Sequence, residues 1–336
     1  MPAGAAAIMV AGAGSWGTAL AIMLARAGAP TLLWGRDPAH MATLAAERRN
    51  GRYLPGVSFP PALELSHDLD AGLARSSTVV VATPLGGVAA LLERVARRSR
   101  PLPRLVWACK GIEPGTLRLV HEIAEAVLGP GVEHGVLSGP TFAAEVVAGQ
   151  PTAAVIATAS TALAQDMVSR LHGGSLRIYS NPDVVGVELA GAVKNVLAIG
   201  AGIADGLGFG ANTRAALVTR GLAEMVRMGV ALGARPATFT GLAGLGDLVL
   251  TCTDDKSRNR RLGIALGRGM DLAQALAGIG QAVEGVPTAA ALRALAARHA
   301  VQMPISDAVA QVLDGKCRPD DAVRTLLARD PAPESI

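Results

Sequence analysis

The sequence predicts a two-domain α/β protein, in which a doubly wound, mostly parallel sheet is followed by an all-helical C-terminal domain. Its 336 residues exceed what one hydrophobic core usually serves. The first half alternates short apolar runs with amphipathic stretches, which is typical of βαβ units. In the second half strand patterns nearly vanish, and helical windows rich in Ala and Leu follow one another.

The predicted strands are short β-branched or apolar runs at residues 6–12, 31–34, 78–83, 104–108, 135–138 and 153–157. The predicted helices of the second half cover residues 184–204, 213–232, 259–267, 287–299 and 305–313. A turn-forming Ser180-Asn181-Pro182 lies between the halves. We therefore predict domains at residues 1–180 and 181–330, with a disordered tail at 331–336.

Composition excludes several classes of protein. Cys109, Cys252 and Cys317 are far apart, which favours reduced thiols over disulfides or a metal site. The most apolar stretch contains Glu188 and Lys194, so we expect no membrane insertion. The N-terminus lacks the basic start of a signal peptide, which predicts a cytoplasmic protein. The net charge of +4 comes with clustered basic residues, which indicates a local anion site and no nucleic-acid partner.

A glycine motif follows the first predicted strand. Residues 12–17 read GAGSWG, and a helical pattern starts at once afterwards. This context is that of a Rossmann-type dinucleotide site. Gly12 would permit the tight turn, Gly14 the approach of the pyrophosphate, and Gly17 close packing of helix on strand. The alternative is a glycine-rich turn without a ligand.

Arg36 follows the second predicted strand, where an NAD-specific site would have an acidic residue; Asp37 comes only next. An arginine there can accept a 2′-phosphate. The sequence therefore predicts that NADPH is used at least as well as NADH, unless Arg36 is a solvated loop charge.

Lys194 lies in a helical window that is otherwise almost free of charge. Desolvation lowers the pKa of a lysine, which makes it a usable proton donor or acceptor near neutrality. The alternative is a surface lysine that extends its ammonium group to solvent.

Basic residues cluster at residues 256–261, just before an apolar helical pattern. Cations oppose the dipole at a helix N-terminus by about 0.3–1 kcal/mol each, unless an anion binds there. Ser257, Arg258 and the backbone N–H groups are a candidate phosphate site. A solvated face partly neutralised by Asp254 and Asp255 is the alternative.

Three further polar residues lie beside glycines. Lys110 and Thr141 follow predicted strands, at the edge where open α/β sheets bind ligands. Asp247 ends a glycine-rich segment that we interpret as a turn, from which it could position Lys194. None of the six histidines lies in these segments, which disfavours a histidine-based hydroxyacid dehydrogenase.

Five segments, GAGSWGTA (12–19), WACKG (107–111), SGPTFA (138–143), GAVKNV (191–196) and GLAGLGDL (241–248), occur in this order. With them the chain resembles the bacterial NAD(P)-dependent glycerol-3-phosphate dehydrogenases over nearly its whole length. The resemblance implies reduction of dihydroxyacetone phosphate to sn-glycerol 3-phosphate, the precursor of glycerophospholipids. It also implies a helical domain similar to that of 6-phosphogluconate dehydrogenase.

The resemblance implies roles for individual residues. Lys194 would be the proton-transfer residue. The substrate contacts would be Lys110, Gly139, Thr141, Lys194, Asp247, Ser257, Arg258 and Asn259. The contacts to NAD(H) or NADP(H) would be Gly12, Gly14, Ser15, Trp16, Gly17, Arg36, Lys110, Ala143, Arg258, Ala282 and Glu284. No metal is implied.

Two other interpretations remain open. Another two-domain dehydrogenase with a lysine acid-base, of the 3-hydroxyacid or phosphogluconate type, would share most of these features. A non-catalytic NADP(H) sensor would keep the glycine motif but would not need Lys194, Asp247 and Arg258 together. The apolar helical faces of the second domain suit either a homodimer or the domain's own core.

Overall fold

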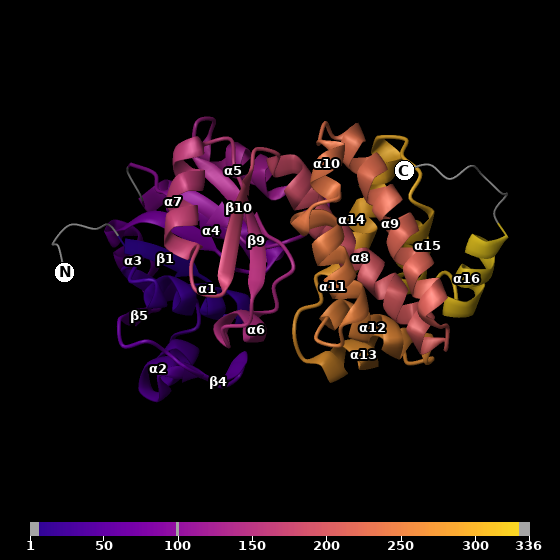
Figure 1. Ribbon diagram of the computed structural model, residues 1–336, viewed down its shortest axis with the longest axis horizontal. Coiled ribbons are helices and arrows are strands. Elements are labelled where there is room, and N and C mark those ends of the chain that lie inside the picture. The colour runs from indigo at the N-terminus through magenta and orange to yellow at the C-terminus, as the bar shows by residue number, and fades with distance from the viewer. Residues whose placement is uncertain (1–6, 99–100, 329–336) are drawn as a thin grey trace. The chain divides into compact units, whose positions relative to one another are not determined.

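The computed structural model describes residues 7–98 and 101–328 and divides the chain into two compact units (Figure 1). The first unit consists of Met1–Cys109 and Val120–Val184, and the second of Lys110–Leu119 and Val185–Ile336. Each unit has its own core of buried apolar side chains. The tail predicted at residues 331–336 lies outside the described residues.

The sheet of the first unit has eight strands in the order β10-β9-β8-β7-β6-β1-β2-β5 within the described residues. They are β1 (Ala7–Ala11), β2 (Thr31–Trp34), β5 (Leu63–Ser66), β6 (Ser76–Val81), β7 (Arg104–Trp107), β8 (His134–Ser138), β9 (Thr152–Ala157) and β10 (Leu176–Asn181). Neighbouring strands are parallel except β8 and β9. The predicted mostly parallel sheet is confirmed.

The six predicted strands correspond to β1, β2, β6, β7, β8 and β9, and the sequence missed both edge strands. In β5 one buried residue is followed by exposed or half-exposed ones, and in β10 the first residues alternate between buried and exposed, so neither is the continuous apolar run that marks the central strands. The short hairpin of β3 (Arg49–Asn50) and β4 (Leu54–Ser58) was also missed, because two or five residues carry too little periodicity.

Helices cover both faces of the sheet (Figure 1). One face carries α1 (Ser15–Arg26), α6 (Ala143–Val147) and α7 (Thr161–Leu171), and the other carries α3 (Leu69–Arg75), α4 (Val88–Arg98) and α5 (Val120–Leu128). The helix α2 (Pro38–Glu47) packs against β3 and β5, and the short 3₁₀ helix η1 (Leu85–Gly87) precedes α4. This doubly wound arrangement places the loops after β1, β2, β6 and β7 at the carboxyl ends of parallel strands, where such sheets bind ligands.

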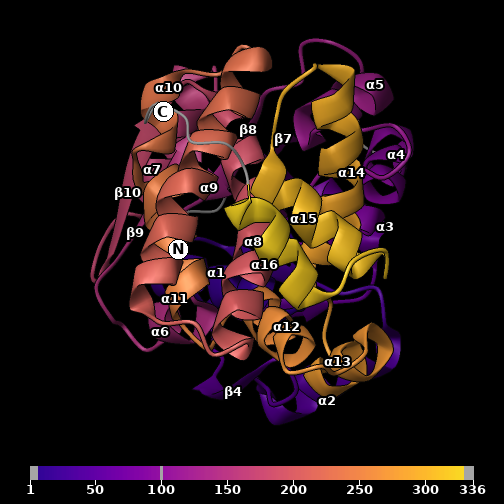
Figure 2. The ribbon, with the colours of Figure 1, turned by 90° about the vertical axis from the view of Figure 1, so that its right-hand side faces the viewer.

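The described part of the second unit is helical, as predicted (Figure 2). Its helices are α8 (Val184–Gly206), α9 (Ala211–Ala231), α10 (Pro236–Phe239), η2 (Leu242–Gly246), α11 (Asp247–Thr253), α12 (Arg258–Gly267), α13 (Leu272–Ile279), α14 (Gly285–Arg298), α15 (Pro304–Leu313) and α16 (Pro319–Leu327). Among the described helices α8 alone is long and apolar enough to cross a membrane, but 89% of its most apolar window is buried. It is the central helix of this unit.

The division of the chain differs from the prediction at Lys110–Leu119, which was assigned to the first domain. This segment belongs to the second unit. Ile112 is fully buried and Leu119 is 2% exposed, and both side chains pack into the helical core. The segment is therefore an excursion of the chain between β7 and α5 that delivers Lys110 to the second unit.

Candidate active site

Three charged side chains from distant parts of the sequence meet in the second unit. Lys194 Nζ of α8 donates a hydrogen bond to Asp247 Oδ1 of α11 over 2.8 Å, and Lys110 Nζ donates to Asp247 Oδ2 over 2.5 Å. Lys194 is 8% exposed and Asp247 2% exposed. Three residues that the resemblance implied as substrate contacts therefore form one largely buried cluster with a net positive charge.

Burial lowers the pKa of Lys194 from 10.5 to about 8. The carboxylate of Asp247 opposes this shift, and the positive charge of Lys110 adds to it. A lysine in this state exchanges a proton near neutral pH, which an exposed lysine does not. The alternative of a lysine that reaches solvent is wrong.

Asp247 remains ionised in this cluster. Burial alone would raise its pKa, but Lys110 and Lys194 outweigh burial and hold the pKa below its ordinary value. The carboxylate thus provides a permanent negative charge that fixes the Lys194 ammonium group by a hydrogen bond.

Thr251 completes the cluster and was not found from the sequence. Its Oγ1 accepts a hydrogen bond from Lys194 Nζ at 2.8 Å and donates one to the carbonyl oxygen of Asp247 at 2.6 Å. Thr251 and Asp247 are four residues apart on α11, so both face Lys194. That spacing was the available signal, but it is informative only if the segment is helical.

The interpretation of residues 244–247 as a turn is wrong. Leu242–Gly246 form a π-helix, and Asp247 begins α11. Gly244 is needed for close packing, because a Cβ atom there would overlap the carbonyl of Phe239 in α10. Gly244 thus allows the π-helix to pack on α10, and the segment does not reverse the chain.

The first turn of α12 is held from several sides. Ser257 is its N-cap, and Ser257 Oγ accepts a hydrogen bond from the Arg260 N–H at 3.2 Å. Asn259 Nδ2 donates to Asn195 Oδ1 at 2.9 Å, and Asn259 Oδ1 accepts from the Gly285 N–H at 3.0 Å. Because Asn195 follows Lys194 in α8, this pair fixes the start of α12 beside the lysine cluster.

Arg258 lies between these buried residues and contacts the segment before α14. Its Nη1 donates to the carbonyl of Ala282 at 2.7 Å. Burial lowers the pKa of Arg258, and the charge of Glu284 opposes that shift. Burial likewise raises the pKa of Glu284, and Arg258 opposes that shift. The structure therefore brings together Arg258, Ala282 and Glu284, three of the residues implied as cofactor contacts.

Two of the four cations in the basic segment are already paired with carboxylates. Lys256 Nζ lies 3.8 Å from Asp254, and Arg260 is bound to Asp205 and Asp255. The count of cations in the sequence therefore overestimated the positive charge that is available to an anion in this segment. Of the other two cations, Arg261 is exposed and Arg258 is half-buried at the start of α12, so Arg258 and this helix start remain as the candidate groups.

Glycines let α8 and α12 approach each other at backbone distance. A Cβ atom at Gly202 of α8 would overlap the carbonyl of Arg260, and one at Gly263 of α12 would overlap the carbonyl of Ile199. Gly206 and Gly267 repeat this contact one turn further along each helix. The four-residue spacing on both helices was a readable signal that the sequence analysis did not use.

In the first unit, the glycine loop lies between β1 and α1. Gly12 has φ +130°, and a Cβ atom there would lie 2.6 Å from the carbonyl oxygen of Ala82. A Cβ atom at Gly17 would overlap the carbonyl of Gly12, whereas one at Gly14 would meet nothing within 4 Å. Gly12 and Gly17 thus serve the packing of the loop, and the space beside Gly14 is open to a ligand.

The N-terminus of α1 suits an anion. Within the described residues no side chain caps this helix, and its first turn contains no acidic residue. Its backbone N–H groups and dipole therefore favour a pyrophosphate. Trp16 is half-buried against the core of the first unit, so a ligand can contact only part of its side chain.

Asn50 supports this loop and was missed by the sequence analysis. It is fully buried, and its Nδ2 donates to the Ala13 carbonyl at 3.0 Å and to Thr18 Oγ1 at 2.8 Å. Nearby, Ser15 Oγ donates to the Tyr53 carbonyl at 2.5 Å. Asn50 lies in the two-residue strand β3, where no pattern marked it.

Arg36 follows β2 and is exposed. The next residue, Asp37, is the N-cap of α2, and its Oδ1 accepts hydrogen bonds from the N–H groups of Ala39 at 3.0 Å and His40 at 3.3 Å. Since this carboxylate serves as a cap, Arg36 is the better candidate for contact with a ribose substituent.

The other predicted contacts of the first unit follow β8. Gly139 has φ +135°, Thr141 Oγ1 donates to the Gly139 carbonyl at 3.3 Å, and Ala143 begins α6. These residues are close in sequence at the end of a strand. Their contacts with ligands stay predictions.

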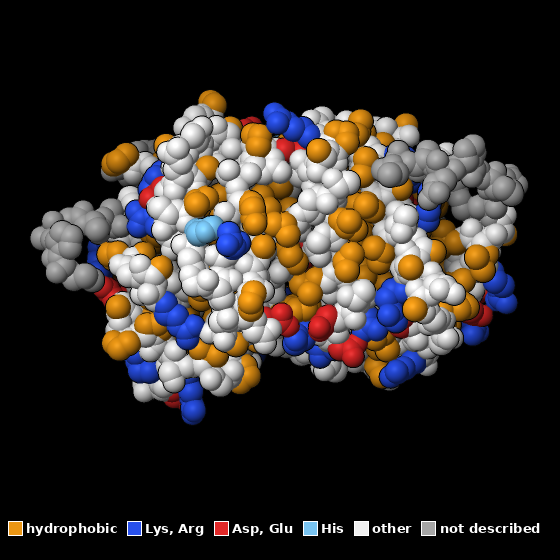
Figure 3. Space-filling model, viewed as in Figure 1, with side chains coloured by type: hydrophobic (Ala, Val, Ile, Leu, Met, Phe, Trp, Pro, Cys, Tyr) orange, Lys and Arg blue, Asp and Glu red, His pale blue; other side chains and the backbone are white. Residues whose placement is uncertain are grey.

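On the face seen in Figure 3, Lys and Arg side chains are scattered in small groups between neutral and hydrophobic ones. Across residues 7–98 and 101–328, no group of three or more His, Cys, Asp or Glu side chains could hold a metal ion. Cys109, Cys252 and Cys317 are all among the described residues, and none of them is in a disulfide bond.

Two family models match the chain. One, described as the N-terminus of NAD-dependent glycerol-3-phosphate dehydrogenase, matches residues 7–164, and the other, described as its C-terminus, matches residues 183–324. A glycerol-3-phosphate dehydrogenase [NAD(P)+] of Nitrosococcus oceani is 54% identical over 326 residues, which cover 97% of this chain and 95% of the relative. The chain belongs to the NAD(P)-dependent glycerol-3-phosphate dehydrogenase family.

Other members of the family support this assignment. A glycerol-3-phosphate dehydrogenase [NAD(P)+] of Shigella boydii is 53% identical over 325 residues, with 96% of each chain covered. The crystal structure of glycerol-3-phosphate dehydrogenase from Coxiella burnetii has a TM-score of 0.93 and 45% identity, covering 96% of this chain and 98% of that one. The chain is therefore an NAD(P)-dependent oxidoreductase, and the resemblance noted from the five segments is confirmed.

Proposed function

We propose that this chain catalyses the reversible reduction of dihydroxyacetone phosphate to sn-glycerol 3-phosphate, with Lys194 as the residue that gives and takes the proton. The observation that carries the proposal is the buried contact between Lys194 Nζ and Asp247 Oδ1 at 2.8 Å, with a lysine pKa of about 8. When bound, the nicotinamide cofactor supplies the hydride.

The lysine cluster supports a specific role for the ammonium group. A protonated lysine has three N–H donors, and Asp247 and Thr251 accept two of them. The third can point to the ketone oxygen, stabilise the negative charge that develops there, and then transfer its proton. In the oxidation direction the neutral amine accepts the hydroxyl proton.

The cofactor contacts are proposed from the loop geometry of the first unit. The open space beside Gly14 and the uncapped N-terminus of α1 suit the pyrophosphate. Ser15, Trp16, Arg36 and Ala143 would make further contacts, and Arg36 would bind the 2′-phosphate of NADPH. Lys110, Arg258, Ala282 and Glu284 would complete the cofactor contacts.

The substrate phosphate would bind at the start of α12. Arg258 provides a guanidinium fork, and the first N–H groups of the helix add donors. Ser257, Asn259, Gly139 and Thr141 would make the remaining substrate contacts. Binding the phosphate away from the reacting carbon orients the ketone before the chemical step.

Replacement of Lys194 tests the proposal. Lys194→Ala should reduce kcat by about 10²–10⁴-fold, the usual contribution of a general acid, while NADPH still binds. Lys316→Ala is the matched control, because Lys316 is an exposed lysine paired with Asp314. Near-normal turnover in Lys194→Ala would end the catalytic role of Lys194.

A substrate panel separates this reaction from its alternatives. NADPH oxidation should be fast with dihydroxyacetone phosphate and slow with keto acids, and the series should be repeated with NADH. Fast turnover of a keto acid would favour a hydroxyacid dehydrogenase. NADPH binding without turnover of any phosphorylated ketone would favour a sensor.

We also propose that the enzyme works in the cytoplasm, without membrane insertion, and supplies the glycerol backbone of glycerophospholipids. In a bacterium without its own glycerol-3-phosphate dehydrogenase, the chain should restore growth without added glycerol 3-phosphate, and failure with well-expressed protein would contradict this. A homodimer is a further proposal, and light scattering of the purified protein would contradict it by giving the mass of one chain.

A further inference from the structure

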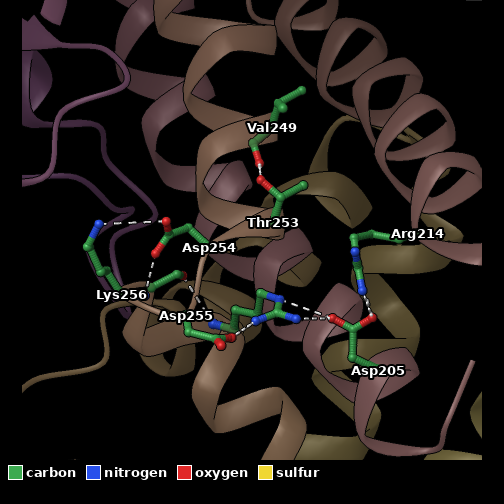
Figure 4. Close-up of polar contacts among 9 residues, drawn as sticks. Asp205, Arg214, Val249, Thr253, Asp254, Asp255 and Lys256 are labelled. Atoms are coloured by element: carbon green, nitrogen blue, oxygen red, sulfur yellow. Dashed lines mark hydrogen bonds and ion pairs between the residues drawn. The ribbon is translucent and has the colours of Figure 1, made fainter. Parts of the chain in front are cut away.

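A cluster of four charged side chains lies beside the first turn of α12 (Figure 4). Asp205 lies near the C-terminal end of α8, Arg214 in the first turn of α9, and Arg260 in the first turn of α12. Asp255 lies in the loop between α11 and α12. None of these residues was predicted to contact substrate or cofactor.

Asp205 binds both arginines through separate oxygen atoms. Arg260 Nη2 and Nε donate to Asp205 Oδ2 at 2.6 and 3.0 Å. Arg214 Nη2 and Nε donate to Asp205 Oδ1 at 2.6 and 3.1 Å. The side chains of Asp205 and Arg260 are each 9% exposed, so this contact is largely shielded from solvent and salt.

Arg260 has a second carboxylate partner, Asp255, which is 83% exposed. The guanidinium group of Arg260 is therefore paired with two carboxylates and is not available to bind a ligand. It instead ties the loop before α12, through Asp255, to the end of α8, through Asp205. The link to Asp205 spans 55 positions of the sequence.

Arg258 is the residue proposed to bind phosphate, and the residues on either side of it in the sequence are held by hydrogen bonds. Ser257 caps the helix, Asn259 is bound to Asn195 and Gly285, and Arg260 is bound to Asp205. With both sides held, the position of Arg258 depends on these contacts. Rigid support of this kind is what a binding site needs to hold its geometry.

We propose that Asp205 and Arg260 are positioning residues that set the start of α12, and with it Arg258, for the phosphate group of the substrate. They act through the helix and do not touch the substrate. The proposal rests on the phosphate role of Arg258 proposed above. It predicts that loss of the Asp205–Arg260 contact weakens phosphate binding but leaves the chemistry at Lys194 in place.

Steady-state kinetics of matched variants test the proposal. Arg260→Gln and Asp205→Asn should each raise the KM for dihydroxyacetone phosphate about tenfold, because a small misplacement of a binding group is costly. The inhibition constant of inorganic phosphate should rise in parallel. The value of kcat should stay within about twofold of wild type, because Lys194 and its partners are not changed.

Arg214→Gln is the control for a purely structural role, since it removes the other arginine from the same carboxylate but does not touch α12. Its KM should change less than about twofold. An equal rise of KM in Arg214→Gln and Arg260→Gln would overturn the proposal, as would an unchanged KM in a folded Arg260→Gln, or a fall of kcat without a change of KM.

Two further variants keep the test decisive. If Arg260→Gln does not fold, the exposed Asp255→Asn should still raise KM in the same direction by a smaller factor, and an unchanged KM there would overturn the proposal. Arg258→Gln tests the proposed function separately. If Arg258→Gln keeps the wild-type KM, the phosphate role of Arg258 fails, whatever Arg260→Gln shows.

Discussion

The two units present their candidate functional groups in different ways. In the first unit the backbone dominates: Gly12 and Gly17 allow a tight loop, and α1 begins directly after Gly14, beside which there is open space. In the second unit buried charges dominate, with Lys194 bound to Asp247 and Arg260 bound to Asp205. A backbone site follows from local spacing, whereas a charged cluster depends on residues that only folding brings together.

The buried charges of the second unit and the glycine loop of the first unit are destabilised by different kinds of substitution. A buried charge is stable only while its partner remains, because an unpaired ion in the interior loses its hydration without compensation. A loop built from glycines carries no such charge, but it tolerates no Cβ atom where backbones touch. The two units should therefore respond differently to conservative substitutions.

The largest expected effect is in the charged cluster. Asp247→Asn should lower the free energy of unfolding by about 3–5 kcal/mol, since Lys194 and Lys110 lose their shared carboxylate. Urea denaturation measures the loss. Asp314→Asn is the control, because Asp314 pairs with the exposed Lys316 and such pairs contribute little. Equal losses in both variants would remove the energetic contrast between buried and exposed pairs.

A smaller effect is expected in the glycine loop. Gly14→Ala should fold as the wild type does, because its Cβ atom meets nothing within 4 Å, yet it should weaken NADPH binding on the order of tenfold. Fluorescence titration with NADPH measures the affinity. The control Gly278→Ala also adds a Cβ atom in open space, in α13 of the second unit, and should bind normally. Unchanged affinity in Gly14→Ala would show that no ligand approaches this position.

The smallest expected effect concerns Arg36. Arg36→Ala should weaken NADPH binding by about 1 kcal/mol, typical of an exposed charge pair, and leave NADH binding unchanged. Comparison of KM for the two cofactors measures it. If the ratio of the two KM values does not change, Arg36 has no contact with the 2′-phosphate and the preference for NADPH has another origin.

The sequence could predict the parts that depend on local pattern. The glycine loop, the central strands and the helix that carries Lys194 all have a strong period or a fixed spacing. The hairpin with Asn50 has neither, because β3 is only two residues long. Asn50 was therefore missed, although it binds the glycine loop directly through Ala13.

The charged residues of the second unit were only partly predicted from the sequence. Lys194, Asp247 and Lys110 were singled out, but residues 244–247 were interpreted as a turn and the helix α11 that begins at Asp247 was not predicted, which hid Thr251. Counting cations at residues 256–261 could not show that Arg260 pairs with Asp205, which lies 55 positions away. Side-chain partners at such separations follow from the packing of α8 on α12, and the local sequence does not specify them.

The pH dependence of the reaction tests the central claim most directly. The pKa of Lys194 is lowered by burial to about 8, so the folded protein loses this proton well below pH 10.5. Reduction needs the protonated form, and oxidation needs the neutral form. The pKa of the neighbouring Cys252 is raised by burial to about 12, so this thiol does not titrate in the same range.

The decisive measurement is kcat/KM for dihydroxyacetone phosphate reduction and for glycerol 3-phosphate oxidation, each from pH 6.5 to 9.5. Our account predicts that reduction falls above about pH 8 while oxidation rises over the same interval, with one shared inflection. Flat profiles, or two profiles that move in the same direction, would contradict the assignment of Lys194 as the group that transfers the proton.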